Sequence, residues 1–192
     1  MDDGRAPGRL AVIGGPMFAG KSTELVRRVE RARIAGRGTL VVAHDLDVRS
    51  GAGRVATHSG LGVDSVSVAD AAAIVPLVTA GLTLVAVDEA QFFGPALVDV
   101  VQGLADDGLD VVVAGLTVTF DGQPFEPLPS LMALAESVTR LTAVCVVCGR
   151  DAAYHVRLVP DDGDPRVASP THVGGAETYE ARCRAHRSPG RQ

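Results

Sequence analysis

A glycine-rich loop near the start of the chain constrains the fold more than any other feature of the sequence. Residues 15–22 read GPMFAGKS, which fits the pattern G-x(4)-G-K-[S/T] at every fixed position. Glycines let backbone N–H groups approach phosphate oxygens, the lysine reaches the β- and γ-phosphates, and the serine hydroxyl ligates Mg²⁺. The pattern therefore predicts a nucleoside triphosphate site formed by Gly15, Pro16, Met17, Phe18, Ala19, Gly20, Lys21 and Ser22.

The segments on either side of the loop support this prediction. An apolar run at residues 9–14 is typical of a buried strand, and residues 22–35 show helical spacing, with Leu25, Val29 and Ala32 on one face. A helix that begins at the loop adds the positive end of its dipole to the phosphate site. Strand, loop and helix in this order are the context that the pattern requires.

Three further apolar runs predict more strands of the same sheet. Runs rich in valine and leucine occur at residues 39–44, 83–93 and 109–116. We expect a helix over 95–104 and a loop over 47–62, where Gly, Ser and Arg show no periodicity. Apolar strands that alternate with helices are typical of a parallel sheet covered on both faces. Residues 1–141 are therefore expected to form an α/β nucleotide-binding domain.

Two acidic residues stand where the third of these strands leaves the sheet. Parallel sheets gather their ligands at the carboxyl ends of strands, and in phosphate-loop proteins an aspartate at this place holds Mg²⁺. Asp88 is therefore expected to hold Mg²⁺, and Glu89 is a candidate general base or a residue that orients water. The alternative interpretation is that both are solvated loop residues.

Three cysteines and a histidine form two pairs near the C-terminus. Cys145 and Cys148 are separated by two residues, and Cys183 and His186 repeat this spacing. Tetrahedral Zn²⁺ takes Cys₃His ligand sets with short spacing inside each pair, so we expect a closed, structural zinc site. Residues 142–192 are then a small zinc-binding lobe, with a short strand over 153–158. Buried thiols unrelated to a metal remain the alternative.

Composition narrows the class of protein. The formal net charge of −5 over 192 residues argues against a general nucleic-acid binder, which usually carries a basic excess. No apolar run approaches the roughly 18 residues that span a bilayer, and the N-terminus lacks the apolar core of a signal peptide. We therefore expect a cytoplasmic protein that binds neither nucleic acid nor membrane.

These motifs together resemble the type II thymidine kinases. The resemblance extends from about residue 9 to residue 186 and is carried by GPMFAGKSTEL (15–25), DEAQFF (88–93), PF (124–125), LAESVTRLTAVC (134–145), AAYHVRL (152–158) and VGGAETYEARC (173–183). It implies a RecA-like α/β core with a mostly parallel sheet, and a smaller zinc-held lobe whose lasso loop closes over the substrate. It also implies transfer of the ATP γ-phosphate to the 5′-hydroxyl of thymidine or deoxyuridine, in a homotetramer inhibited by dTTP.

The resemblance assigns roles to individual residues. Glu89 is implied as the base that takes the proton of the 5′-hydroxyl, and Met17 as the residue that touches the thymine methyl group. We expect Phe18, its neighbour, to pack inward as core. The implied ATP and Mg²⁺ contacts are the phosphate loop with Asp47, Arg49, Asp88 and Gln91. The implied nucleoside contacts are Met17, Phe92, Leu116, Phe120, Thr171, His172, Val173, Gly174, Gly175 and Tyr179.

Three positions depart from the family pattern. Thr117 stands where an acid is usual, Asp121 stands where Arg or another polar residue is common, and His155 stands at a position beside the base that is often Thr. The departures keep open the alternative of a kinase for another deoxynucleoside.

A second alternative comes from a different class of protein, a phosphate-loop ATPase whose zinc lobe binds nucleic acid. In that case Glu89 would activate water, and the arginines of the first helix would contact phosphates. Glu24 and Arg28 stand at helical spacing, however, and such pairs are typical of a solvated helix face.

Overall fold

The computed structural model describes residues 6–46, 54–56, 62–159 and 174–187. Its centre is a six-stranded sheet in the order β5-β2-β6-β7-β1-β8, in which every pairing is parallel. The predicted α/β class with a parallel sheet is confirmed. The strands are β1 (Leu10–Gly15), β2 (Gly38–His44), β5 (Val66–Val68), β6 (Leu82–Val87), β7 (Asp110–Leu116) and β8 (Ser137–Arg140).

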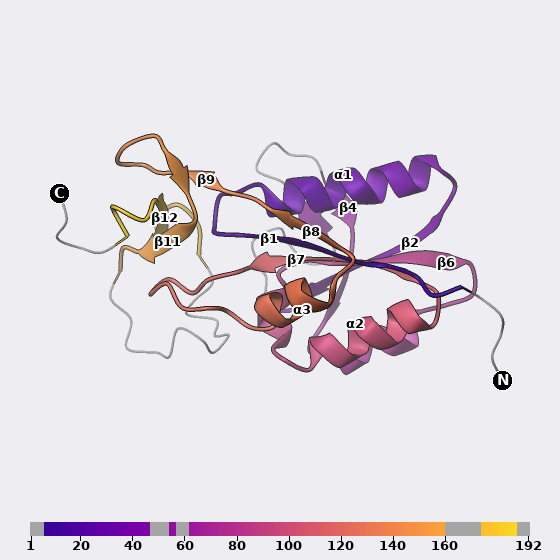
Figure 1. The fold of residues 1–192 in the computed structure, drawn as a ribbon. Helices are drawn as coiled ribbons and strands as arrows, with labels where there is room; N and C mark the ends of the chain where they lie inside the picture. Colours follow the sequence, from indigo (N-terminus) through magenta and orange to yellow (C-terminus); the bar gives the residue numbers. More distant parts are fainter. Residues whose placement is uncertain (1–5, 47–53, 57–61, 160–173, 188–192) are drawn as a thin grey trace.

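Helices cover both faces of this sheet. Figure 1 shows α1 (Lys21–Ile34) on one face, with α2 (Leu97–Asp106) and α3 (Leu128–Leu134) on the other. Two 3₁₀ helices, η1 (Ala72–Leu77) and η2 (Ala90–Phe93), accompany them. Within the described part of the chain, no helix has the length and apolarity needed to cross a bilayer.

The strands bury side chains on both faces, which explains their continuous apolar sequences. Successive residues of a strand point to opposite faces, so each strand contributes to two cores. The core under α1 includes Ile13, Val41, Ala86 and Val112, whereas the core under α2 and α3 includes Val12, Val42, Val87 and Val111.

One predicted strand ends earlier than its sequence indicated. The apolar run 83–93 forms β6 only as far as Val87. Glu89 then adopts a left-handed conformation, with φ of 49°, and Ala90–Phe93 forms η2. A left-handed residue cannot continue a strand, so the chain turns at the carboxyl end of the sheet.

The loop prediction for 47–62 was wrong at one point. Arg54–Ala56 forms β3, which pairs antiparallel with β4 (Gly62–Asp64). Val55 and Val63 are buried in the core under α1. Strands of three residues are too short to show a periodicity, which is why the sequence did not indicate them. Residues 47–53 and 57–61 lie outside the described part of the chain.

Short antiparallel strands follow the sheet from residue 143 onward. β9 (Ala143–Val144) pairs with β10 (Asp151–Ala152), and β11 (Tyr154–Arg157) pairs with β12 (Tyr179–Arg182). β11 confirms the strand predicted over 153–158. These strands, which we call the lobe, lie at the end of the sheet where β1 leads into α1 (Figure 1).

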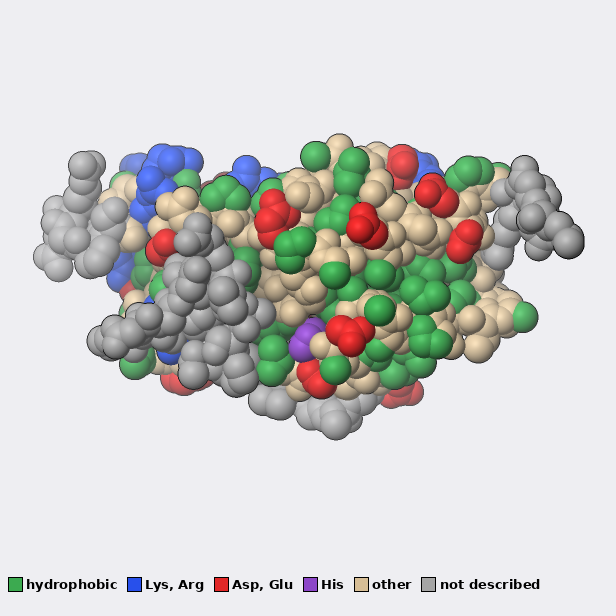
Figure 2. Space-filling view, turned by 90° about the horizontal axis from the view of Figure 1, so that it is seen from below, with side chains coloured by type: hydrophobic (Ala, Val, Ile, Leu, Met, Phe, Trp, Pro, Cys, Tyr) green, Lys and Arg blue, Asp and Glu red, His purple; other side chains and the backbone are tan. Residues whose placement is uncertain are grey.

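Charge is distributed unevenly over the described surface. Figure 2 shows the face that carries α2 and α3, where apolar and acidic side chains predominate. The largest group of Lys and Arg side chains in that view lies toward the lobe. Among the residues that the structure describes, this face shows no continuous basic stripe of the kind that nucleic-acid binders carry.

Candidate functional site

The phosphate loop connects β1 to α1 through two left-handed residues. Phe18 has φ of 66° and Gly20 has φ of 82°, and Gly20 directly precedes the helix. The Lys21 side chain is buried, and its Nζ donates a hydrogen bond to the Pro16 carbonyl oxygen at 2.9 Å. The ammonium group is thus held over the loop, where backbone N–H groups and the helix N-terminus also attract anions.

Packing, and not only phosphate chemistry, requires the glycine that opens the motif. A Cβ atom on Gly15 would lie 2.7 Å from the Leu141 carbonyl oxygen and 3.2 Å from the Cβ of Ala19. Ala19 in turn packs against the core of the lobe, which contains Cys145, Cys183 and three alanines. The phosphate loop is therefore in contact with the lobe through Ala19.

The two bulky residues of the loop have different environments. Met17 is buried, with 9% of its surface exposed, whereas Phe18 is 37% exposed. The expectation that Phe18 packs inward was wrong, because its positive φ turns the side chain away from the core. The predicted contact of Met17 with a thymine methyl group remains a prediction.

The two predicted acids lie together at the carboxyl end of β6. Both are buried, and an Asp88 Oδ1 accepts a hydrogen bond from the Glu89 N–H at 3.0 Å. Burial, followed by the charge of Glu89, raises the pKa of the Asp88 carboxyl above its ordinary value. The Ser22 hydroxyl and the Lys21 ammonium lower the pKa of Asp88, so this acid faces the phosphate loop.

Gln91 holds Glu89 in place. Its Nε2 donates a hydrogen bond to Glu89 Oε2, and its Oε1 accepts one from the Leu116 N–H at 3.0 Å. Gln91 thus joins Glu89 to the end of β7. Gly115 makes this possible, because a Cβ atom there would lie 2.9 Å from Gln91 Oε1. The positive φ of Glu89 is a backbone strain of the kind that concentrates at functional sites.

Two of the predicted aromatic residues meet beside the lobe. The ring centroids of Phe120 and Tyr179 are 6.4 Å apart. Arg157 lies over both rings, at 5.8 Å from the first and 5.6 Å from the second, and donates a hydrogen bond to the Tyr179 hydroxyl at 3.2 Å. Sequence reasoning missed Arg157, since nothing in its local sequence marks an arginine that stacks on distant rings. Phe92 contacts His44 instead, with centroids 6.0 Å apart.

Two glycines of the predicted lasso loop lie in the described part of the chain. Gly174 and Gly175 precede β12, and the Gly175 carbonyl oxygen accepts hydrogen bonds from the N–H groups of Thr178 and Tyr179, each at 3.0 Å. Asp47, Arg49, Thr171, His172 and Val173 lie outside the described residues.

The three departures from the family pattern surround the site. Thr117 follows β7, and its buried hydroxyl has no hydrogen-bond partner among the described residues. Asp121 accepts a hydrogen bond from the Thr119 hydroxyl within a turn. His155 is buried on β11, next to the Tyr179 ring.

The predicted zinc ligands converge. The ligand atoms of Cys145, Cys148, Cys183 and His186 all lie within 4.8 Å of one another. Cys145 Sγ and His186 Nδ1 are 3.7 Å apart, Cys148 Sγ and Cys183 Sγ are 3.7 Å apart, and Cys183 Sγ and His186 Nδ1 are 3.3 Å apart. A tetrahedral zinc ion places sulfur ligands about 3.8 Å apart and sulfur and nitrogen about 3.5 Å apart. The cluster therefore fits a zinc site.

Backbone hydrogen bonds hold the turns that carry these ligands, and backbone N–H groups favour the thiolate form of Cys145. The Gly149 N–H donates to the Cys145 carbonyl oxygen at 2.9 Å, and the His186 N–H donates to that of Cys183 at 3.0 Å. Burial alone would raise the pKa of the Cys145 thiol, but nearby backbone N–H groups and His186 lower it to about 5. A thiolate is the form that binds metal.

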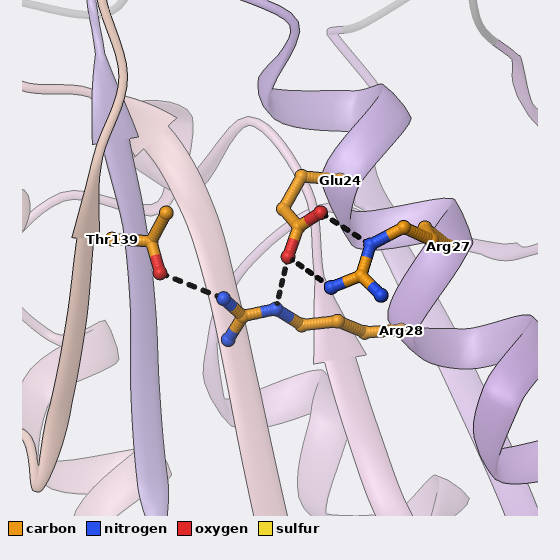
Figure 3. Close-up of polar contacts among 4 residues, drawn as sticks. All are labelled: Glu24, Arg27, Arg28 and Thr139. Atoms are coloured by element: carbon orange, nitrogen blue, oxygen red, sulfur yellow. Dashed lines mark hydrogen bonds and ion pairs between the residues drawn. The ribbon is translucent and has the colours of Figure 1, made fainter.

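Arg27 and Arg28 of α1 are paired within the protein. Figure 3 shows Glu24 between Arg27 and Arg28, with nitrogen–oxygen distances of 2.6 Å to the first and 2.8 Å to the second. The hydrogen bond from Arg27 is the main influence that lowers the pKa of Glu24 to about 2. Arg28 also donates to the Thr139 hydroxyl of β8 at 2.7 Å. These contacts favour a structural role over contact with nucleic-acid phosphates.

Comparison with known proteins gives one consistent result. The family model described as thymidine kinase matches residues 8–187. The chain is similar to a thymidine kinase of Pyrobaculum aerophilum, with 47% identity over 180 residues that cover 92% of this chain and 97% of the relative. It is also 45% identical to one of Halobacterium salinarum strain R1 over 182 residues, which cover 92% of each chain. A thymidine kinase of Deinococcus radiodurans is 44% identical over 196 residues, covering 95% of this chain and 92% of the relative.

Proposed function

The chain belongs to the thymidine kinase family, and from that premise we propose that it transfers the γ-phosphate of ATP to the 5′-hydroxyl of thymidine, giving dTMP and ADP. Deoxyuridine is the second expected substrate. The observation that best supports this activity is the position of Glu89, a buried carboxylate held by Gln91 beside the phosphate loop.

The loop binds and neutralises the triphosphate in this proposal. Lys21 and the backbone N–H groups of residues 15–20 contact the phosphates, while Ser22 and Asp88 would hold Mg²⁺. Mg²⁺, when bound, supplies positive charge to the phosphate oxygens. Phosphoryl transfer needs in-line positioning and charge neutralisation more than covalent help from the protein. Asp47 and Arg49 are proposed to lie near the phosphates on the basis of the family resemblance.

Glu89 is the proposed catalytic residue. A 5′-hydroxyl is a poor nucleophile, and a carboxylate that accepts its proton as the oxygen attacks accelerates the reaction by about 10²–10⁴-fold. Gln91 donates a hydrogen bond to one carboxylate oxygen of Glu89 and thereby helps to fix the orientation of this carboxylate.

The nucleoside is proposed to lie between the loop and the lobe. Phe120 and Tyr179 offer aromatic surface for the base, and Met17 offers an apolar contact for the methyl group. The other proposed contacts follow the family resemblance and are Phe92, Leu116, Thr171, His172, Val173, Gly174 and Gly175.

The metal cluster has a structural part in this proposal. Zn²⁺ bound by Cys145, Cys148, Cys183 and His186 would join the turn after β9 to the end of β12. It would thereby fix β12, which carries Tyr179. We also propose two domains, 1–141 and 142–192, because the parallel sheet belongs to the first range and the metal ligands belong to the second.

Three further properties are proposed from the family resemblance. The protein is a cytoplasmic homotetramer, dTTP inhibits it, and it binds neither nucleic acid nor membrane. Light scattering measures the assembly, and an activity titration with dTTP measures the inhibition.

A substrate panel tests the proposed function. Purified protein with ATP and Mg²⁺ is offered thymidine, deoxyuridine, deoxycytidine and deoxyguanosine, and the products are separated by chromatography. We expect dTMP and dUMP to dominate. ATP hydrolysis without any nucleoside product would support an ATPase instead, and preferential formation of another nucleotide would support a different deoxynucleoside kinase.

A further inference from the structure

A cavity lies between α1 and the amino ends of the strands, at the opposite end of the sheet from the phosphate loop. Its volume is about 420 Å³, which is within the range of small-molecule sites. The register pairs Leu10 with Val111 at this end and Gly15 with Leu116 at the other, so about 16 Å of strand separate the cavity from the phosphate loop. We call it the arginine cavity after four of its lining residues, Arg9, Arg28, Arg31 and Arg37.

Two of these arginines form ion pairs within the protein. Asp110 is the acidic residue that lines the cavity, and both of its carboxylate oxygens are engaged. Its Oδ1 accepts a hydrogen bond from the Arg9 N–H at 3.1 Å, and its Oδ2 accepts one from the Arg37 guanidinium at 2.7 Å. Arg28 is paired with Glu24 of the same helix at 2.8 Å. Asp110 therefore balances the charge of Arg37, and Glu24 balances that of Arg28.

The other two arginines keep their charge unbalanced. The side chains of Arg9 and Arg31 form no hydrogen bond or ion pair with any residue that the structure describes. Glu136 precedes Ser137 of the cavity wall, but its Oε2 accepts a hydrogen bond from the Leu10 N–H at 2.7 Å, and it pairs with neither arginine in the described part of the chain. The cavity therefore carries positive charge that a bound anion would neutralise.

The two paired arginines are fixed in position and retain unused donors. Figure 3 shows that Arg28 extends from α1 to the Thr139 hydroxyl of β8, to which it donates a hydrogen bond at 2.7 Å. Arg37 donates to the hydroxyl and the carbonyl oxygen of Thr83, at 3.2 and 2.8 Å. A guanidinium group has five N–H donors, of which Arg28 uses two and Arg37 three among the described residues. Both can therefore bind a ligand without losing these contacts.

The spacing of residues along α1 brings charge and space to the same place. Arg28, Arg31, Ala32 and Ala35 all line the cavity, and their separations of three, four and seven residues put them on one face of the helix. The two alanines leave room that larger side chains would fill. Several guanidinium groups around one cavity suit a phosphate group, which offers more oxygens and more negative charge than a single carboxylate.

We propose that the arginine cavity is a second phosphate site, which binds a small molecule that carries one or two phosphate groups. The site is separate from the phosphate loop, and it goes beyond the proposed function because it does not require that the chain phosphorylate a nucleoside. The unpaired Arg9 and Arg31 supply the charge that attracts the ligand, and the fixed Arg28 and Arg37 supply oriented donors.

Calorimetric titration with inorganic pyrophosphate, without divalent cations, tests the site. Lys21→Ala in the full-length chain weakens the phosphate loop, so that the remaining binding reports the arginine cavity. We expect this variant to bind about one pyrophosphate per chain. In that background Arg9→Gln and Arg31→Gln should each weaken binding roughly tenfold, since each removes a charge-assisted hydrogen bond. Without the Lys21 substitution, combining the two glutamines should lower the bound pyrophosphate from about two per chain to about one.

Arg33→Gln is the matched control. Arg33 is exposed on α1, as Arg31 is, but does not line the cavity. Removing this charge should change the pyrophosphate affinity by less than about twofold. Because Arg9 and Arg31 make no side-chain hydrogen bond with the described residues, their variants should keep the Tm of the parent protein. Absence of pyrophosphate binding in Lys21→Ala would refute the site. Equal weakening by Arg31→Gln and Arg33→Gln would also refute it, because it would show a general attraction of anions to α1.

Discussion

At the scale of single residues, the site depends on one carboxylate that the backbone and a neighbour hold in an unusual position. Glu89 has a left-handed conformation, is 7% exposed, and accepts a hydrogen bond from Gln91. Left-handed backbone is unfavourable for residues with a Cβ atom by roughly 1 kcal/mol. The left-handed residue ends β6 and begins η2 at the carboxyl end of the sheet.

The first prediction concerns this carboxylate. Glu89→Gln keeps the size of the side chain and removes the proton acceptor. We expect kcat to fall by about 10²–10⁴-fold, while thymidine still binds with nearly the same affinity. Steady-state kinetics and calorimetric titration measure the two effects. Asp99→Asn, on the exposed side of α2, is the matched control and should leave both unchanged. A near-normal kcat in Glu89→Gln would remove Glu89 as the base.

At the scale of elements, the site is assembled where β6, β7 and the loop after β1 end side by side. The register pairs Val87 of β6 with Val113 of β7, and Gly15 of β1 with Leu116 of β7. The parallel arrangement therefore brings Glu89 and Gln91 next to the Leu116 N–H, which completes the hydrogen bonds of the Gln91 side chain. Gly115 leaves the space that this contact occupies.

A second prediction follows from that space. In Gly115→Ala the added Cβ would lie 2.6 Å from Leu128 Cδ2 and 2.9 Å from Gln91 Oε1, so both side chains must move. We expect a loss of roughly 1–3 kcal/mol in the free energy of unfolding and a fall in kcat of roughly tenfold, because Glu89 loses its support.

The control for this variant lies in α2. A Cβ atom on Gly103 would meet nothing within 4 Å. Gly103→Ala should therefore stabilise the helix by roughly 0.5–1 kcal/mol without changing kcat. Denaturant unfolding and steady-state kinetics measure both variants. If Gly115→Ala had normal kinetics, the support of Glu89 by Gln91 would be unimportant for turnover.

At the scale of the whole molecule, the lobe and the sheet meet around the phosphate loop. Ala19 of the loop packs on the core that contains Cys145 and Cys183. β12 carries Tyr179 at one end and leads to Cys183 at the other. Loss of the metal should therefore displace β12 and, with it, Tyr179, which weakens the binding of the nucleoside.

A third prediction tests that connection. Elemental analysis should give about one zinc ion per chain. Cys148→Ser should release the metal, lower Tm by roughly 5 °C or more, and raise the KM for thymidine more than the KM for ATP. Val147→Ala changes an exposed neighbour in the same turn and should leave all three values unchanged. A metal-free protein with an unchanged Tm would refute the zinc assignment.

The sequence by itself determined the parts of this protein whose chemistry is local. Residues 15–22 indicated the phosphate loop because backbone approach to phosphate requires glycine, lysine and serine at fixed spacing. The two pairs from Cys145 to His186 indicated the metal cluster because tetrahedral ligands come from short turns. Apolar runs indicated the parallel sheet because its strands are buried on both faces.

Only the tertiary structure decided the contacts between distant segments. It turned Phe18 outward, joined Gln91 to Leu116, and placed Arg157 over Phe120 and Tyr179. It also left the Nδ1 of His155 buried, with no hydrogen-bond partner in the part of the chain that the structure describes. Such features depend on the register of strands, on the sign of a backbone angle and on which residues share a core. Those quantities arise when the whole chain packs, so no local pattern encodes them.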